Sequence, residues 1–457
     1  MTMSLVSSLI RRTTYPLYLR HRGLDGFLAK MDMMARLEKF SAVDLAELQL
    51  ESLQNLMKHV YRNSPYYRQV FRDIGMTPSD IESIEDLRHF PVLTKDIIRD
   101  NMDQILAENY PPHTRAKSST GGSTGQSLTF WRDHNCRDMK TAMEYNFKRW
   151  YGFELGDKQL YFWGAVQDFD QHESFKTRLV RSLATRSWFV TSSDLDDDNL
   201  ERTVQWIRKL KPKLVQAYPS IIYSFAKRIA SKNIRLNFDT IVCSAEQLFD
   251  YQREALEVIF GARVYNKYGS REFGSIAAEC PKYKKMHYFA PGVILESVDS
   301  QGRPAGDKLG NLLVTDLWHY AMPLIRYQVG DLVRLEYSHC PCGSKLPKIA
   351  EVAGRVVDVV TKPNGKMITG LSLIKIIRKL EYKIQAQLIQ KSPNYFEFNY
   401  VAEKPLSEQK MNIILNRFES VMESPVEIEF IQHDRLEREK SGKFRYVKSE
   451  VKPPFLS

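Results

Sequence analysis

The sequence has no long apolar run, no block of like charges and no low-complexity segment. No apolar stretch reaches the roughly 18 residues of a membrane-spanning helix. In the opening "MTMSLVSSLIRRTTYPLYLRHRG" the arginines follow the short apolar stretch rather than precede it, so we expect neither a signal peptide nor an anchor, and a cytoplasmic protein. Because no run of five or more like charges is present, a polynucleotide-binding arm is poorly supported and no nucleic acid is expected as a partner.

Cysteine is scarce too, with five in 457 residues. Disulfides are not expected in a cytoplasmic chain, so the cysteines indicate metal ligands or packed thiols. Three thiols and one imidazole form a candidate tetrahedral set for structural Zn²⁺: Cys280, His287, Cys340 and Cys342. His339 is an alternative to His287, and buried free thiols are the other interpretation. Cys136 and Cys243 are expected in the core.

The composition is that of a globular protein, with 43% hydrophobic and 26% charged residues. A chain of 457 residues is too long for one ordinary core, so two or more domains are expected. The net charge of +11 is spread along the chain. Such a basic protein attracts anions such as nucleotides or lies near an acidic membrane surface.

Three stretches differ in pattern. Residues up to about 110 are mostly helical, and Asp44 with Glu47 three residues on indicates a helix start. Between about 128 and 335, short apolar runs such as "KLVQAY" and "TIVCSAE" alternate with helical segments. This alternation predicts an α/β fold whose main sheet lies in this stretch. The remainder predicts a small α+β domain of about 100 residues. We therefore expect a large N-terminal domain over 1–355, with a helical lead-in over about 1–110, and a C-terminal domain over 356–457.

The loop "SSTGGSTGQS" at 118–127 is rich in glycine and hydroxyl groups. Successive backbone N–H groups in such a run point into one concavity, which suits the oxygens of a polyphosphate. It is not the phosphate loop of the common NTPases, because Gln126 stands where that pattern has lysine. A flexible surface loop is the alternative on composition alone.

Five further stretches follow this loop: "SAEQL" at 244–248, "YNKYGSREFG" at 265–274, "MPLIRYQVGDL" at 322–332, "VAGRVVD" at 352–358 and "REKSGKFRYV" at 438–447. In this order they resemble the core motifs of the adenylate-forming enzymes. The resemblance is nearest to phenylacetate–coenzyme A ligases and the capsule-synthesis homologues related to them, and it covers nearly the whole chain. Some phenylacetate–coenzyme A ligase relatives carry a similar Cys/His set, which supports the structural zinc.

The resemblance implies a site for ATP and Mg²⁺. The residues implied to bind ATP are Ser119, Thr120, Gly121, Gly122, Ser123, Thr124, Gly125, Ser244, Ala245, Glu246, Tyr268, Gly269, Ser270, Asp331 and Arg355. Glu272 would hold Mg²⁺, and Lys443 would hold the carboxylate of the acid and the α-phosphate. The structural alternatives are that Asp331 caps a turn, that Glu272 starts a helix and that Lys443 is a solvated surface lysine.

The chemistry implied is activation of a carboxylic acid as an acyl-adenylate with release of pyrophosphate, and transfer of the acyl group to an acceptor. A mobile C-terminal domain with a hinge near Asp358 would deliver Lys443. The stretch "VTKPNGKMITGLSL" after the hinge departs from the coenzyme A ligase pattern, although Lys362 and Lys366 offer anion contacts. A sugar amine or hydroxyl in polysaccharide synthesis is therefore the expected acceptor.

Two other functions stay open. One is an acyl- or aryl-coenzyme A ligase of the phenylacetate type, which would use coenzyme A. The other is a non-catalytic relative that binds a nucleotide or a nucleic acid. The acid itself cannot be named, but Trp163 in "YFWGAVQDF" and Phe273 are candidates for the wall of its pocket, with a core position as the alternative.

Overall fold

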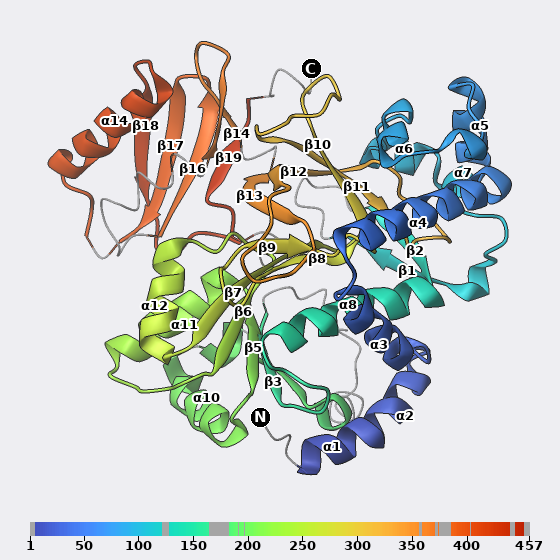
Figure 1. Cartoon of the computed structure of the whole chain (residues 1–457). Helices are drawn as coiled ribbons and strands as arrows, with labels where there is room; N and C mark the ends of the chain where they lie inside the picture. Colours follow the sequence, from blue (N-terminus) through green and yellow to red (C-terminus); the bar gives the residue numbers. More distant parts are fainter. Residues whose placement is uncertain are drawn as a thin grey trace.

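The computed structural model of the chain describes residues 5–120, 128–163, 182–190, 192–195, 197–355, 359–370, 373, 385–402, 404–438 and 444–451 (Figure 1). It has the predicted α/β architecture, with a large mixed sheet, covering helices and a second, smaller sheet in the C-terminal part. Within the described ranges, no helix combines the length and the apolar character needed to cross a bilayer.

The lead-in is helical, as predicted. Its α-helices are α1 (Leu5–Arg12), α2 (Thr14–His21), α3 (Phe27–Leu37), α4 (Ala42–Asn63), α5 (Pro65–Asp73), α6 (Lys95–Asp100) and α7 (Met102–Ile105). The longest, α4, begins after Ser41, whose hydroxyl accepts from the amide of Asp44 at 3.1 Å. It buries Leu53, Met57 and Val60, which recur at helical spacing on one face. This apolar face joins α4 to the core of the large sheet.

Among the described residues, the main sheet has eleven strands, and five neighbouring strands of it are parallel. In spatial order these are β4 (Ser187–Val190), β3 (Gln159–Phe162), β5 (Leu214–Ala217), β6 (Thr240–Cys243) and β7 (Arg263–Ser270). Strands β5 and β6 are buried along their whole length. Strands that are covered on both faces have mostly apolar sequences instead of alternating apolar and polar residues. This explains why "LVQA" and "TIVC" do not show the alternation of a strand with one face in water.

Helices cover both faces of the parallel strands. Val215, Ile241 and Val264 pack in one core cluster with the side chains of α10 (Asp197–Leu210), α11 (Pro219–Ser231) and α12 (Asp250–Phe260). Leu214 and Val242, which point the opposite way, join the cluster of α8 (His134–Trp150) and the lead-in helices. Figure 1 shows α8 on one side and α10, α11 and α12 gathered on the other.

The sheet continues beyond β7 in antiparallel strands. These are β8 (Gly274–Glu279), β9 (Met286–Tyr288), β13 (Lys348–Arg355), β12 (Tyr327–Glu336), β11 (Gly310–Asp316) and β10 (Val293–Val298). A separate hairpin pairs β1 (Arg115–Ser119) with β2 (Thr129–Asp133), and the glycine-rich loop connects its two strands.

The C-terminal part has its own sheet and core. Its strands are β16 (Gln385–Ser392), β17 (Tyr395–Val401), β18 (Glu427–Gln432) and β19 (Val447–Ser449), with helix α14 (Glu408–Met422) and a hairpin of β14 (Val359–Thr361) and β15 (Met367–Thr369). Phe396, Phe398 and Phe418 lie at its centre. This is the predicted α+β arrangement, while the boundary between 355 and 356 stays a prediction.

Candidate functional site

The motif residues gather where the parallel strands end. Ser244 directly follows β6, and Tyr268 to Ser270 close β7. Cys243 of β6 pairs with Asn266 of β7, so the two motifs are neighbours in the sheet. In open α/β sheets, ligands bind outside the carboxyl ends of the strands, where the connections supply polar groups. The strand direction thus explains why motifs far apart in sequence meet.

Tyr268 and Asp331 are in direct contact. The Tyr268 hydroxyl donates to Asp331 Oδ2 at 2.5 Å. Asp331 lies inside β12 rather than in a turn, so the alternative that it caps a turn is wrong. It pairs in register with Arg355 of β13, although only the backbone of Arg355 belongs to the described structure. The structure therefore brings together three of the residues that the resemblance implies for ATP binding.

Glu272 lies in the turn between β7 and β8, so it does not start a helix. Its side chain is 6% exposed, and Tyr327 donates to Oε1 at 3.0 Å. Arg132 of β2 donates to the backbone oxygen of Glu272 at 3.1 Å and also to that of Arg271. Among the described residues, no other group donates to the carboxylate, so Oε2 stays available to a cation. Carboxylate oxygens are ligands that Mg²⁺ prefers.

The glycine-rich stretch begins in β1 and, in the sequence, connects it to β2. Thr120 closes the tip: its amide donates to Leu128 O at 2.9 Å, and its hydroxyl accepts from the Leu128 amide at 2.9 Å. Arg271 Nη1 donates to Ser119 O at 3.2 Å, which fixes the tip beside the turn of Glu272. The other predicted loop residues lie outside the described ranges: Gly121, Gly122, Ser123, Thr124, Gly125 and Gln126.

Gly269 and Ser270 shape the turn that presents Glu272. A Cβ at Gly269 would overlap the backbone oxygen of Gly274 on the paired strand, so only glycine fits there. The Ser270 hydroxyl accepts from the Phe273 amide at 3.4 Å. Phe273 is fully buried in the main core, so its core alternative holds and the prediction that it walls a pocket is wrong.

A largely buried ionic cluster includes Lys267, the residue before Tyr268 in β7. Glu144 of α8 contacts Lys267 of β7 at 2.5 Å and Lys148 at 3.4 Å. Burial raises the pKa of Glu144, but the two lysines outweigh it and hold that pKa well below its usual range. The Glu144 carboxylate stays ionised, and its ion pair holds Lys267, the residue before Tyr268, in place. Sequence patterns gave no sign of this cluster, since its members come from distant segments.

Ser244, Ala245 and Glu246 form the turn after β6. Ser244 N donates to Ala217 O at 3.1 Å, which continues the sheet by one residue. Ala245 has φ of 72°, a conformation that costs a non-glycine residue roughly 1–2 kcal/mol and that turns the next side chain outward from the strand. The Glu246 carboxylate lies between the backbone amides of Ser220 and Phe444, at 3.0 and 2.9 Å. It therefore contacts the C-terminal part.

Lys443 lies outside the described ranges, but its neighbours are placed. Phe444 follows it and is 4% exposed, and Arg438 precedes it by five residues. Arg438 Nη1 donates to Ser220 Oγ at 2.7 Å and lies 3.7 Å from Glu246 Oε1. The described residues on both sides of Lys443 therefore contact the turn after β6.

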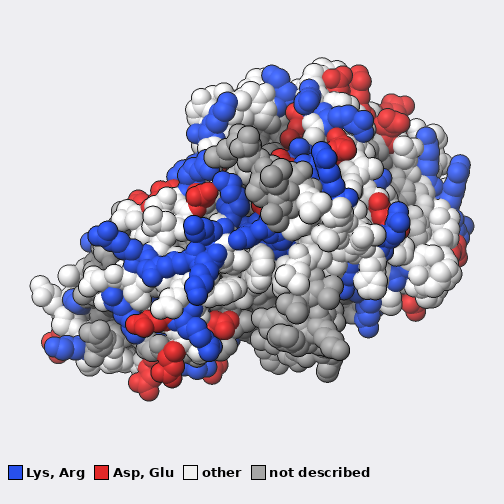
Figure 2. Space-filling view, turned by 90° about the horizontal axis from the view of Figure 1, so that it is seen from below, with Lys and Arg blue, Asp and Glu red and all other residues white. Residues whose placement is uncertain are grey.

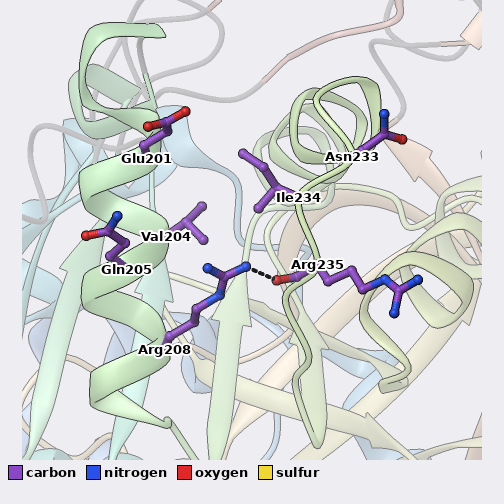
Figure 3. Close-up of a pocket in the computed structure, with 7 residues that line it drawn as sticks. All are labelled: Glu201, Val204, Gln205, Arg208, Asn233, Ile234 and Arg235. Atoms are coloured by element: carbon purple, nitrogen blue, oxygen red, sulfur yellow. Dashed lines mark hydrogen bonds between the residues drawn. The ribbon is translucent and has the colours of Figure 1, made fainter.

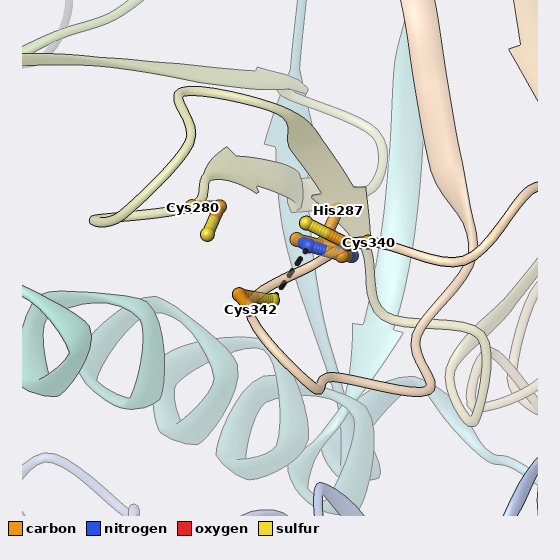
Figure 4. A group of neighbouring side chains, drawn as sticks. All are labelled: Cys280, His287, Cys340 and Cys342. Atoms are coloured by element: carbon orange, nitrogen blue, oxygen red, sulfur yellow. Dashed lines mark hydrogen bonds between the residues drawn. The ribbon is translucent and has the colours of Figure 1, made fainter.

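The predicted zinc ligands meet in one small space (Figure 4). The ligand atoms of Cys280, His287, Cys340 and Cys342 all lie within 4.8 Å of one another. Cys280 follows β8 and His287 belongs to β9, whereas Cys340 and Cys342 come from the connection between β12 and β13. Because β13 pairs with β9, residues about 55 positions apart are brought together.

His287 is oriented as a metal ligand. Its Nδ1 lies 2.8 Å from Leu346 O, which leaves Nε2 facing Cys342 Sγ at 3.5 Å. Burial lowers the pKa of His287, so the imidazole is neutral, the form that binds metal. His339 is exposed and is not a member of the group, so geometry favours His287. Cys136 and Cys243 are buried thiols, as expected.

A second buried set of potential metal ligands is already neutralised by a lysine. The ligand atoms of Cys136, Asp316 and His319 also lie within 4.8 Å of one another. Here, however, Lys140 Nζ already lies 2.7 Å from Asp316 Oδ2, and His319 Nε2 contacts Trp131 O. The lysine supplies the positive charge that a metal would bring.

One cavity lies away from these motifs (Figure 3). It has a volume of about 420 Å³ between α10 and the segment after α11, and is lined by Glu201, Val204, Gln205, Arg208, Asn233, Ile234 and Arg235. Arg208 donates to Arg235 O at 2.5 Å, and Figure 3 shows the Arg235 side chain directed away from α10. The lining residues precede β5 and β6, whereas the motif residues follow these strands. The cavity is therefore no part of the candidate site.

Comparison with known proteins agrees with this geometry. Residues 360–450 match the CapK C-terminal domain family. Protein CapK of Staphylococcus aureus is 27% identical over 355 residues, 76% of each chain. A phenylacetate-coenzyme A ligase of Pseudomonas putida is 27% identical over 358 residues, 74% of this chain and 75% of the relative.

Solved structures show the same fold. A 2-hydroxyisobutyryl-CoA ligase in the postadenylation state gives a TM-score of 0.73 at 19% identity, covering 91% of this chain and 92% of that one. The same ligase in the thioesterification state, with 2-HIB-AMP and CoA, gives 0.60 at 18% identity, covering 91% of each chain. The chain is thus a homologue of CapK and of the phenylacetate–coenzyme A ligases, with the fold of the adenylate-forming ligases, and these predictions are confirmed.

Proposed function

We propose that this homologue of CapK and the phenylacetate–coenzyme A ligases uses ATP to convert a carboxylic acid into an acyl-adenylate, releasing pyrophosphate. The observation that carries the proposal is the joining of separate motifs at one edge of the sheet. Tyr268 contacts Asp331, Tyr327 holds Glu272, and Arg271 ties the phosphate-loop hairpin to the same turn. These are the groups that a bound nucleotide requires at its ribose, its metal and its phosphates.

Asp331 and Glu272 would bind different parts of the Mg²⁺–nucleotide complex. A carboxylate such as Asp331 has two oxygens that accept from the two ribose hydroxyls, and the nearby Tyr268 hydroxyl keeps it oriented. Glu272 is fixed by Tyr327 and offers its second oxygen to Mg²⁺, which when bound neutralises charge that develops on the phosphates. Hydrogen bonds from Tyr268 and Tyr327 orient the two carboxylates before the nucleotide binds, so these groups need no rearrangement during the reaction.

Exchange of labelled pyrophosphate into ATP tests the proposal. The full-length protein with Mg²⁺ is incubated with ATP and a panel of aliphatic, aromatic and hydroxy acids. We expect exchange that depends on at least one acid. ATP binding without exchange for any acid would favour the non-catalytic nucleotide-binding alternative, and salt-sensitive binding of an oligonucleotide would favour the nucleic-acid alternative.

The acyl acceptor is proposed to be a sugar amine or hydroxyl rather than coenzyme A. Residues 360–450, which would shape the second half-reaction, match the CapK C-terminal domain. Lys362, one of the two lysines considered as anion contacts, instead pairs with Glu423 at 2.7 Å and is 6% exposed. A lysine committed in this way is a poor contact for the phosphates of coenzyme A.

Coenzyme A is therefore expected to accept the acyl group poorly. Mass spectrometry of a reaction with the active acid, ATP and coenzyme A should show acyl-adenylate with little thioester. Amino sugars and nucleotide sugars added in parallel should yield an acylated product. Stoichiometric thioester formation would show that the chain is an acyl-coenzyme A ligase and that the proposed acceptor is wrong.

We further propose that the four clustered ligands hold one structural zinc. Three thiols and one imidazole complete a tetrahedral set, so no position remains for a reactive water. When bound, the ion would join the β8–β9 connection to the β12–β13 connection, next to the strand that carries Asp331.

Peripheral contact with an anionic membrane is also proposed. Leu9 and Leu17 of the first two helices are 62% and 66% exposed, and Arg12, Arg20 and Arg22 beside them are exposed. Seen from below, Lys and Arg side chains gather in a band over one half of that face of the molecule (Figure 2). Exposed leucines next to exposed arginines in the sequence suit the headgroup region of a bilayer.

Vesicle co-sedimentation checks this surface. The protein should sediment with vesicles that contain anionic lipid, less so at high salt, and not with neutral vesicles. The double variant Leu9→Glu, Leu17→Glu should lose at least half of this binding, whereas Val258→Glu, at a residue 81% exposed on α12, should keep it. Equal binding of both variants would rule out the leucines as the contact.

A further inference from the structure

Arg132 reaches from the β1–β2 hairpin to the turn that carries Glu272. It lies on β2, and its Nη2 donates to the backbone oxygen of Arg271 and, at 3.1 Å, to that of Glu272. Its guanidinium also lies over the buried ring of Phe130, with 4.9 Å between Cζ and the ring centroid. One side chain of the hairpin therefore contacts the two peptide groups on either side of the Glu272 α-carbon.

The charge of Arg132 faces backbone oxygens instead of a carboxylate. Within the described ranges, no acidic side chain lies at ion-pair distance from this half-buried guanidinium. Asp133, the next residue, accepts from two backbone amides, and Asp316 pairs with Lys140 at 2.7 Å. Because removing a charge from water is costly unless it is paired, an arginine that donates only to backbone oxygens indicates a role beyond stability.

These contacts define the backbone of Glu272. A peptide group is planar and trans, so fixing its oxygen also fixes the direction of its N–H group. In the second of the two peptide groups, the Phe273 amide donates to Ser270 Oγ at 3.4 Å, on the edge opposite Arg132. With both planes fixed, the Glu272 side chain leaves the backbone in one direction. Tyr327 then holds the far end of that side chain at 3.0 Å.

The strand position of Arg132 is fixed by a buried histidine. His319 Nε2 lies 2.5 Å from the backbone oxygen of Trp131, the preceding residue. Because an oxygen of this kind can only accept, Nε2 carries the proton. Burial lowers the pKa of the His319 imidazole, so the ring is neutral. The hairpin and the turn of Glu272 are thus joined by a side chain that belongs to none of the predicted motifs.

We propose that Arg132 is a positioning residue that directs the Glu272 carboxylate at Mg²⁺. The proposal rests on the proposed adenylation activity. Arg132 acts on the backbone oxygens around Glu272 and not on the ion or the nucleotide. An arginine suits this position because each terminal nitrogen carries two N–H groups, so Nη2 reaches two oxygens at once. Residues that orient metal ligands in this way typically change metal affinity by about 10- to 100-fold when they are replaced.

Arg132→Met removes the charge and the donors while keeping a long side chain. Isothermal titration of the full-length protein measures the affinity for ATP with Mg²⁺ and, separately, with EDTA. Mg²⁺ should tighten ATP binding by the wild-type protein. In Arg132→Met this gain should shrink by about tenfold or more, while the affinity in EDTA and the melting temperature stay close to those of the wild type. Arg132→Lys, which keeps a cation and donors, should recover part of the gain.

A double-mutant cycle shows whether Arg132 acts through Glu272. Glu272→Gln should itself lose most of the gain from Mg²⁺, because an amide oxygen carries no charge. Adding Arg132→Met to it should cost nothing further, since residues that act as one unit are not additive. Arg115→Met is the matched control: Arg115 lies on the paired strand β1, 5.4 Å from the Trp131 ring centroid, and its variant should keep the full gain.

Hydrogen–deuterium exchange measures the contact in the absence of ATP. In Arg132→Met the amides of peptides covering 268–276 should exchange at least about tenfold faster, because local opening of the turn costs less free energy. Arg115→Met should show wild-type uptake in the same peptides. The measurement needs neither a metal nor an active enzyme.

The outcomes separate this proposal from the proposed function. An unchanged gain from Mg²⁺ in Arg132→Met would overturn the positioning role, whether or not deuterium uptake rises. An equal loss of ATP affinity with Mg²⁺ and with EDTA would also overturn it, because Arg132 would then act on the nucleotide or on the fold. A wild-type protein that binds ATP more tightly with Mg²⁺ but exchanges no pyrophosphate with any acid would refute adenylation, while titration of the variants would still decide the role of Arg132.

Discussion

Replacing Lys443 by alanine is expected to lower acid-dependent pyrophosphate exchange by about 10²–10³-fold, the loss found when one preorganised charge is removed from a transition state. Arg438 and Phe444, which flank this lysine in the sequence, both contact Glu246 in the turn after β6. We expect the ammonium of Lys443 to attract both the carboxylate of the acid and the α-phosphate.

The binding of ATP should survive in Lys443→Ala, because the groups at the ribose and the metal are unchanged. Isothermal titration with ATP and Mg²⁺ measures this directly. Lys448→Ala is the control, since Lys448 lies on β19 and is only partly exposed. An exchange rate in Lys443→Ala equal to that of Lys448→Ala would assign the catalytic cation to another residue.

Cys342→Ser is expected to lose the single zinc ion and to destabilise the fold by about 4 kcal/mol or more, a range reached by loss of a structural metal. The variant removes one of four ligands whose atoms lie within 4.8 Å of one another. The segments 280–287 and 340–342 would then no longer be joined through the zinc ion. Metal analysis by mass spectrometry and thermal unfolding of the same samples measure both effects.

His339→Ala supplies the control for the zinc prediction. His339 is adjacent in sequence to Cys340, yet it is exposed and lies outside the group. It should keep one zinc per chain and the wild-type melting temperature. Wild-type protein purified without zinc, or Cys342→Ser with unchanged metal content and stability, would leave the buried free thiols as the correct interpretation.

The class of fold could be predicted from the sequence, and the candidate site residues could be chosen from it, because the motifs carry their chemistry locally. Asp331, Tyr268 and Glu272 were identified from short stretches, and the structure places them at one sheet edge. The zinc group was predicted from residue types alone, since thiols and an imidazole are rare enough to stand out. The order of strands could not be deduced in this way.

Contacts between distant segments were missed. Tyr327 lies within a recognised motif, but only its 3.0 Å contact with Glu272 shows its function. Glu246 contacts Ser220 and Phe444, which lie 26 and 198 residues away in the sequence. Phe273 was misjudged because an aromatic residue beside a motif looks the same in sequence whether it lines a pocket or fills a core.

The first residue of α4 is set by its N-terminal cap. The pair Asp44 and Glu47 indicated a helix start, whereas α4 begins at Ala42. Ser41 and Asp44 form a reciprocal cap: the Ser41 amide donates to Asp44 at 3.0 Å, and the Ser41 hydroxyl accepts from the Asp44 amide. The aspartate therefore lies in the first turn, three residues after the true cap.

Phe249 gives the free protein a preferred resting arrangement. This residue precedes α12 in the large part, yet its ring is 7% exposed and belongs to the apolar cluster of the C-terminal part. If the C-terminal part rotates between two half-reactions, the ring must enter water once per cycle. Burial of such a side chain is worth about 1.5–3 kcal/mol. Burial of this ring alone therefore favours the docked state by roughly ten- to a hundredfold, and an acceptor that binds the rotated state more tightly would offset that contribution.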